Sequence, residues 1–178
     1  MNPEIKLTFD EGYLRVIKPD DVSADYVAGL NDSGVHKYLD TVKHSIQTMQ
    51  TVQDFISINL ASPSSVMFGI WRANAEHYCG TIRLSEINTV HKIANIGLCI
   101  FDKSAWGHGL GSKAIACVTK WAIEDLDLRW IEAGIYEENI ASQKAFLSAG
   151  YEWIADIPGK YMLDSNPAVI KIYANHKA

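Results

Sequence analysis

The segment from Trp106 to Ala114 carries three glycines at alternate positions, directly before a run of residues with helical periodicity. Glycine allows backbone conformations with positive φ and lets a ligand approach the main chain closely. The first turn of a helix has amide groups with no partner inside the helix, and the helix dipole places partial positive charge at the same end. The segment therefore predicts a loop that binds an anion such as a phosphate group.

Length and composition favour a single domain over residues 1–178. Of the 178 residues 48% are hydrophobic, which is enough for one core, and no repeat, low-complexity segment or linker separates two domains. No apolar run approaches the ~20 residues that span a bilayer. The N-terminus lacks the basic start and apolar stretch of a signal peptide. We therefore expect a cytoplasmic protein with no membrane partner.

The charge and the cysteines exclude further classes. A formal net charge of -5 argues against a nucleic-acid partner, which would need clustered Lys and Arg, and fits a small basic or amine-bearing substrate better. The cysteines are odd in number and widely spaced, at Cys79, Cys99 and Cys117, so we expect neither a disulfide framework nor a metal site. Each cysteine is predicted to be a small buried hydrophobic residue.

Hydrophobic periodicity predicts alternating strands and helices in the first half of the chain. Residues 13–17 alternate and contain β-branched side chains, which favours a strand. A helix follows, with Asp20 or Asp21 as its cap, until residues 31–34 break it. A second helix is expected over residues 48–60. Three strand-like runs with hairpin-like connections predict consecutive antiparallel strands: 66–72, 80–87 and 93–101.

The second half predicts a crossover followed by an antiparallel tail. In order, we expect a helix over 110–122, a strand over 129–136, a helix over 140–149, and strands over 151–157 and 168–174. Asn139 can cap the second helix and Gly150 can end it. Pro158 and Gly159, with residues 165–167, are expected to join the last two strands. The fold class is therefore α/β, with a mixed and mainly antiparallel sheet flanked by helices.

Three interpretations of the glycine segment compete. A nucleoside triphosphate loop requires Gly-Lys followed by Ser or Thr, whereas this sequence has Gly111, Ser112 and Lys113 in the wrong order. A dinucleotide-binding fingerprint is matched by residues 109–114, but residues 102–105 separate the preceding strand from the first glycine of that match. The loop could also be a structural turn that fits the helix against the sheet.

A resemblance to a known family favours an acyl-carrier ligand. Residues 106–111 resemble the acetyl-CoA signature of the GNAT N-acetyltransferase superfamily, in which Arg or Gln is followed three and five residues later by Gly and by Gly or Ala. Residues 139–151 resemble the family's helix that starts with Asn and ends in Gly and an aromatic residue. The two motifs are about 25 to 30 residues apart and in the right order, which is more specific than either alone. Residues 30–39 also resemble the opening of the subgroup that contains the ribosomal-protein N-terminal acetyltransferases.

The sequence departs from the family pattern at three positions. Trp106 occupies the first motif position, and this Trp is frequent in the subgroup just named. Phe146 stands where many relatives have a Tyr that acts as a general acid, so we expect Phe146 to be a core residue. Asn95 stands where relatives often have an acidic residue, which removes one candidate general base.

The resemblance implies acetyl-CoA as co-substrate and places its binding residues. The amides of residues 107–112 would bind the pyrophosphate, and the edge of the strand at its last two residues would pair with the pantetheine arm. A backbone amide near Phe101 is the candidate contact for the oxyanion. Lys113 could also reach the nucleotide phosphates. The cofactor-binding residues implied are Ile100, Phe101, Trp106, Gly107, His108, Gly109, Leu110, Gly111, Ser112, Asn139 and Lys144.

Three residues are candidates for the chemistry. Ser142, three residues after Asn139 on the same helical face, could assist the departing thiolate. Glu86, near the end of the strand beside the cofactor strand, is the first candidate for the general base, and His91 is the second. Each also has a purely structural interpretation: a serine in the first turn of a helix, a solvent-facing strand residue and a hairpin residue.

The function implied is transfer of an acetyl group from acetyl-CoA to a primary amine, without a covalent enzyme intermediate. The acceptor could be a protein N-terminus, a polyamine, an aminoglycoside or an amino sugar. Two alternatives stay open: a non-catalytic acyl-CoA-binding sensor, and an NAD-dependent oxidoreductase. Exposed sheet edges near the C-terminus make a homodimer possible.

Overall fold

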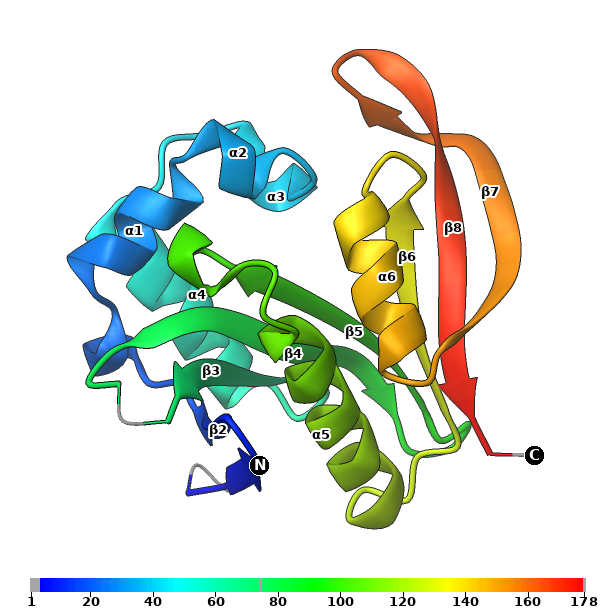
Figure 1. The fold of residues 1–178 in the computed structure, drawn as a ribbon, viewed down its shortest axis with the longest axis horizontal. Helices are drawn as coiled ribbons and strands as arrows, with labels where there is room; N and C mark the ends of the chain where they lie inside the picture. The colour runs from blue at the N-terminus through cyan, green and yellow to red at the C-terminus, as the bar shows by residue number, and fades with distance from the viewer. Residues whose placement is uncertain (1–3, 74, 178) are drawn as a thin grey trace.

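The computed structural model describes residues 4–73 and 75–177, and one eight-stranded sheet runs through them in the order β1-β2-β3-β4-β5-β6-β8-β7 (Figure 1). The strands are β1 (Lys6–Phe9), β2 (Gly12–Val16), β3 (Val66–Arg72), β4 (Tyr78–Asn88), β5 (Ile93–Ile100), β6 (Trp130–Tyr136), β7 (Glu152–Leu163) and β8 (Asn166–His176). The helices are α1 (Ala24–Leu30), α2 (Ser33–His36), α3 (Asp40–Lys43), α4 (Met49–Ala61), α5 (Leu110–Glu124) and α6 (Ile140–Ser148), with 3₁₀ helices η1 (Pro19–Asp21) and η2 (Lys103–Ala105). The mixed, mainly antiparallel α/β architecture predicted from the sequence is confirmed.

The sheet is split between β5 and β6. These two strands are parallel, because α5 carries the chain from one to the other, and they pair only from Ile93–Asn95 to Trp130–Glu132. Beyond Asn95 and Glu132 the strands diverge (Figure 1). The other neighbouring strands are antiparallel. The predicted crossover at the glycine loop is therefore present, and it leaves one edge of β5 unpaired toward β6.

Each face of the sheet has its own core. On one face, the stripe predicted for α5 is buried, with Ile115 and Val118 fully enclosed in a cluster that also contains Phe68 of β3 and Phe146 of α6. On the other face, α1 and α4 pack through a second cluster that includes Tyr26. Burying one such aliphatic side chain stabilises the fold by ~1.5–3 kcal/mol. Residues of β5 alternate between these two cores, so neighbouring residues on the strand face opposite sides of the sheet.

Local signals set most helix ends. Thr48 caps α4 and Asn139 caps α6, each by accepting a hydrogen bond from a backbone amide in the first turn. The predicted cap of the first helix was wrong: Ser23 caps α1, and its side chain accepts from the Tyr26 amide at 3.2 Å. Asp21 is not available for capping, because its carboxylate accepts from the Lys18 amide at 2.7 Å and closes η1.

The C-terminal strands are longer than predicted. Pro158 and Gly159 lie inside β7, at an irregularity in its pairing with β8, and do not join two strands. The turn falls instead at Asp164 and Ser165, which both adopt positive φ. The short elements β1, α2 and α3 were not predicted at all.

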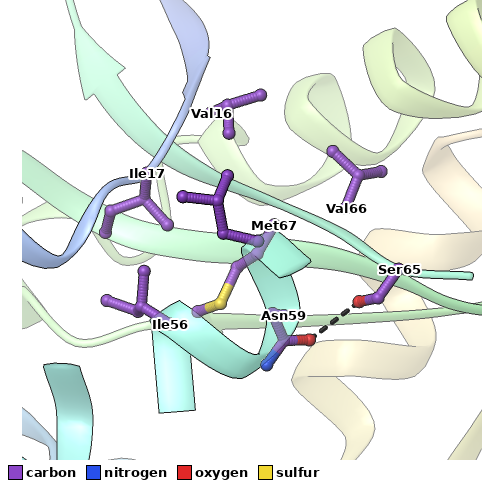
Figure 2. Close-up of a pocket in the computed structure, with 8 residues that line it drawn as sticks. Val16, Ile17, Ile56, Asn59, Ser65, Val66 and Met67 are labelled. Atoms are coloured by element: carbon purple, nitrogen blue, oxygen red, sulfur yellow. Dashed lines mark hydrogen bonds between the residues drawn. The ribbon is translucent and has the colours of Figure 1, made fainter. Parts of the chain in front are cut away.

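A small cavity lies between α4 and the strands β2 and β3 (Figure 2). Its volume is about 10 Å³, and at its rim Ser65 Oγ donates a hydrogen bond to Asn59 Oδ1 at 2.7 Å. Such a space holds one water molecule at most, so it is not a ligand site. Within residues 4–73 and 75–177, no helix has the length and apolar character required to cross a membrane.

Candidate functional site

The glycine loop has the backbone geometry that the sequence predicts. Gly107 and Gly109 adopt φ of 78° and 73°, in the left-handed region that disfavours other residues, and α5 begins directly afterwards. Ser112 Oγ donates to the Gly109 carbonyl at 2.8 Å and holds the first turn. The backbone amides of residues 107–112 have no acceptor among the described residues. They are therefore available to an anion at the positive end of the helix dipole.

Trp106 attaches this loop to the end of β5. Its indole N–H donates to the Ile100 carbonyl at 2.9 Å, while the residue as a whole stays 44% exposed. Lys103 lies 6.0 Å above the ring centroid. The residue that departs from the family motif thus fixes the loop to the strand edge, a role that sequence spacing did not indicate.

The unpaired edge of β5 presents the amides of its even-numbered residues. The Phe101 amide donates to the Cys79 carbonyl of β4 at 3.1 Å. Because backbone groups of alternate residues in an antiparallel strand point to opposite sides, the amides of Leu98 and Ile100 point toward β6. The Ile100 carbonyl, which accepts from Trp106, also points away from β4. The prediction that an amide near Phe101 contacts the oxyanion is therefore wrong for Phe101 itself, whose amide is already paired.

Helix α6 begins opposite this edge. Asn139 Oδ1 accepts from the Ser142 amide at 3.2 Å, which is the capping role predicted for it. Ser142 is half-buried, and its hydroxyl makes no hydrogen bond within the part of the chain that the structure describes. Phe146 is 2% exposed and belongs to the core, as expected.

The two candidate lysines differ in their surroundings. Lys144 is exposed on α6. Lys113 instead forms an ion pair with Glu11, in the turn between β1 and β2. The structure therefore gives Lys113 a protein partner, while Lys144 remains available for an anion.

Glu86 lies where the sheet begins to split. It adopts φ of 54° at an irregularity in the pairing of β4 with β5, and such strain in a non-glycine residue is often found at functional sites. Asn95 Nδ2 donates to Glu86 Oε2 at 2.8 Å, and Trp130 Nε1 donates to Glu132 Oε2 at 2.8 Å. Both carboxylates line an open cavity of about 340 Å³, together with Ile93, Ala94, Asn95, Arg129 and Trp130.

His91 lies at the opposite end of β5 from the glycine loop. It is exposed in the turn before the strand, where its carbonyl accepts from Arg129 Nε at 3.2 Å. From Ile93 to Ile100 the strand rises seven steps of about 3.3 Å, or roughly 23 Å. The structure therefore does not bring His91 to the loop.

Helices α2 and α3 connect the two parts of the split sheet. The Tyr38 hydroxyl donates to the Glu138 carbonyl at 3.2 Å, and the Tyr136 hydroxyl donates to an Asp40 carboxylate oxygen and lies 3.1 Å from the Met162 carbonyl. Burial, and next the bond to Asp40, raise the pKa of Tyr136. Sequence reasoning missed these contacts, because their partners are about 100 residues apart and no local pattern links them.

Known proteins share both the sequence pattern and the fold. A family model described as acetyltransferase (GNAT) domain matches residues 13–152. The uncharacterised N-acetyltransferase YoaA of Bacillus subtilis is 26% identical over 147 residues, which cover 82% of each chain.

Two solved structures superpose closely on this fold. Spermidine N-acetyltransferase from Vibrio cholerae, in complex with CoA and spermine, has a TM-score of 0.82 at 15% identity and covers 93% of this chain and 95% of its own. The ribosomal L7/L12 alpha-N-protein acetyltransferase RimL, in complex with coenzyme A, has a TM-score of 0.81 at 17% identity and covers 94% and 95%. At these identities the likeness establishes the fold.

Proposed function

This chain belongs to the acetyltransferase (GNAT) family, and on that premise we propose that it transfers an acetyl group from acetyl-CoA directly to a primary amine in a ternary complex. The family and the curated relative make it an acyltransferase of the N-acetyltransferase type. The observation that carries the finer proposal is the continuity of two unpaired surfaces. The amides of residues 107–112 lead directly to the edge of β5 at Leu98 and Ile100.

These two surfaces match the two chemical parts of acetyl-CoA. A pyrophosphate group fits the amides at the start of α5, and Lys144 is an exposed positive charge on α6, the helix that packs on α5. An extended arm with amide groups fits a strand edge, because it can pair as an additional strand. An NAD or ATP ligand would use the loop but not the adjacent strand edge. The combination therefore favours acetyl-CoA among the glycine-loop ligands considered.

The residues of the chain orient the reaction. The amine nitrogen forms a bond to the thioester carbonyl carbon while the carbon-sulfur bond breaks, and orientation of the two partners at about 3–3.5 Å lowers much of the barrier. The Leu98 or Ile100 amide can donate to the carbonyl oxygen as it gains charge. Ser142 can donate a hydrogen bond to the leaving thiolate, directly or through water, and Glu86 can receive the ammonium proton, directly or through water.

A cysteine nucleophile is not part of this proposal. Cys99 is the cysteine on β5, and burial raises the pKa of its thiol to about 12. A thiol with that pKa is protonated near neutral pH and is a poor nucleophile. Direct transfer to the amine fits this environment better than a covalent enzyme intermediate.

The acceptor proposed is an amine-bearing small molecule or a peptide amino terminus. One of the two similar structures is a spermidine N-acetyltransferase, and the other is an N-acetyltransferase of the ribosomal protein L7/L12. In this chain, two carboxylates, Glu86 and Glu132, and one cation, Arg129, line the cavity beside the split, and the net negative charge would attract a cationic amine. The sensor alternative rests on Phe146 and Asn95, which supply neither a phenol nor a carboxylate.

Thermal unfolding with CoA, acetyl-CoA, NAD and ATP in parallel tests the cofactor assignment. Ligand at about 100 times its dissociation constant adds ~2.7 kcal/mol and raises the midpoint by several degrees. We expect the midpoint to rise with CoA and acetyl-CoA only. Gly107→Ala should remove most of this shift, because an Ala there must leave the left-handed conformation and move the amides.

Gly159→Ala is the matched control. Gly159 also has a positive φ, 69°, and is exposed, but it lies in β7, away from the loop. We expect a similar loss of stability and an unchanged shift with CoA. Equal CoA shifts in both variants would contradict the loop assignment, and CoA binding without release of thiol in the presence of any amine would favour the sensor.

A further inference from the structure

Gly97, in the middle of β5, lacks the structural reasons that account for the other glycines. An added Cβ at Gly97 would meet nothing within 4 Å among the described residues, and its φ lies outside the left-handed region. Each of the other eleven of the chain's twelve glycines either has a positive φ or would bring a Cβ within 4 Å of another residue. A glycine in a strand interior lowers stability, and it often marks a place where a ligand approaches closely.

Position 97 lies on the face of β5 that is turned away from α5. On β5, Ile96 belongs to the core beneath α5, whereas Cys99 packs with the core of α1 and α4 on the opposite face. Gly97 shares the face of Cys99, because side chains alternate along a strand. It is nevertheless exposed, so the helices on that side do not cover it.

Gly97 lies at the split, next to the open cavity. The next residue on the same face is Asn95, which is bonded to Glu86 at the cavity. Across the split, Gly134 of β6 is also exposed, on the face opposite the buried Ala133. The amides of Leu98 and Ile100 border the same place from the edge of the strand. Gly97 thus leaves the β5 side of the split open on this face, whereas on the β6 side the side chains of Ile170 and Ile172 lie against Gly134.

We propose that Gly97 is a specificity-determining position. Its missing side chain leaves space on the exposed face of β5, and the acceptor amine passes through this space to reach the thioester at the split. This inference rests on the proposed function, in which the glycine loop and α5 hold CoA at the split. The acceptor then approaches from the other face, and its nitrogen must come within about 3–3.5 Å of the carbonyl carbon. A side chain at position 97 would occupy that path.

Substitutions at this position separate an acceptor role from a structural one. Gly97→Ala and Gly97→Val add bulk where no described atom lies, and both residues are at least as compatible with a strand as glycine is. We expect equal or higher thermal stability and a CoA dissociation constant within about twofold of the unsubstituted protein. The KM for the amine should rise by about tenfold or more, and further with Val than with Ala.

The assay uses acetyl-CoA with spermidine and with a short peptide that has a free amino terminus, and it follows both acetylated product and thiol. Gly107→Ala is the control. In this variant we expect the CoA dissociation constant to rise and the KM for the amine to stay unchanged, the reverse of what we expect for the Gly97 variants. Slow hydrolysis of acetyl-CoA without amine should persist in the Gly97 variants, since water needs less space than the acceptor.

Each outcome supports the inference or overturns it. An unchanged KM for the amine in Gly97→Val would overturn it, as would a loss of activity that parallels a loss of stability or of CoA affinity. If the unsubstituted protein acetylates neither of these amines nor any other, the proposed function and the inference that rests on it both fail. That result is distinct from a variant that retains the activity of the unsubstituted protein.

Discussion

Ser142 is held through its backbone and not through its side chain. Its amide donates to Asn139 Oδ1, and its hydroxyl has no protein partner among the described residues. We therefore expect Ser142→Ala to leave the fold and CoA affinity nearly unchanged and to lower kcat by about tenfold to a hundredfold, as loss of one hydrogen bond to a charged leaving group does. Steady-state kinetics with an active amine, together with a CoA titration, check this expectation.

The cap provides the contrast for that experiment. Asn139→Ala should lower the free energy of unfolding by about 1 kcal/mol, because an amide in the first turn of α6 loses its acceptor. Ser142→Ala should not show that loss. If Ser142→Ala weakens CoA binding and leaves kcat unchanged, the hydroxyl belongs to binding and does not stabilise the leaving thiolate.

At the scale of elements, α3 is fastened to β6 by one buried tyrosine. The Tyr136 hydroxyl donates to Asp40, and the Lys43 ammonium lies 3.2 Å from the other oxygen of the same carboxylate. We predict that Tyr136→Phe lowers the free energy of unfolding by about 0.5–1.5 kcal/mol, because the Asp40 carboxylate, whose side chain is 40% exposed, loses a donor. Hydrogen exchange should become faster in α3 and remain unchanged in α5.

The same substitution has a pH signature. In the folded state the raised pKa keeps the Tyr136 phenol protonated at pH values where the unfolded chain, with a pKa of about 10, loses its proton. This contribution is fully present below pH 10 and is lost as the pH rises above it. Stability should therefore fall less steeply above about pH 10 in Tyr136→Phe. Tyr38→Phe, which loses a more exposed bond, is the control, and equal slopes in all three proteins would contradict the assignment.

Local sequence signals predicted the elements that depend on local physics. The apolar stripe of α5, the cap of α6 at Asn139 and the glycines before α5 are set by neighbouring residues, and the structure has them where expected. The helix α3 has four residues and no side-chain cap, so its position depends on tertiary contacts: the bond from Tyr136, far away in sequence, and the packing of Val42 against the core of α1 and α4. The direction of the β5 amides depends on register with β4, which alternation alone cannot fix.

The candidate site follows the same division. The loop of residues 107–112 was predicted from glycine spacing, whereas the role of Trp106 needed the folded position of the Ile100 carbonyl. The freedom around Gly97 could have been suspected from a glycine inside an apolar strand. Showing that nothing packs against it required the fold.

At the scale of the molecule, the backbone pairing is interrupted at the split, whereas the side-chain packing continues across it. Strands β5 and β6 share only the short register from Ile93–Asn95 to Trp130–Glu132. The main core nevertheless continues across the split, since Ile131 and Ile135 of β6 belong to the same cluster as Phe68 and Leu84 on the other side. We therefore propose that residues 1–178 form one domain, whose two parts are joined by the core beneath α5.

One domain with a shared core should unfold in a single cooperative transition. We predict that circular dichroism and tryptophan fluorescence report the same urea midpoint, and that the calorimetric and van't Hoff enthalpies agree. Saturating CoA should move the whole transition, because its proposed site uses β5 on one side of the split and α6 on the other. Two transitions, with only one of them raised by CoA, would place a domain boundary between β5 and β6 and would contradict the single-domain proposal.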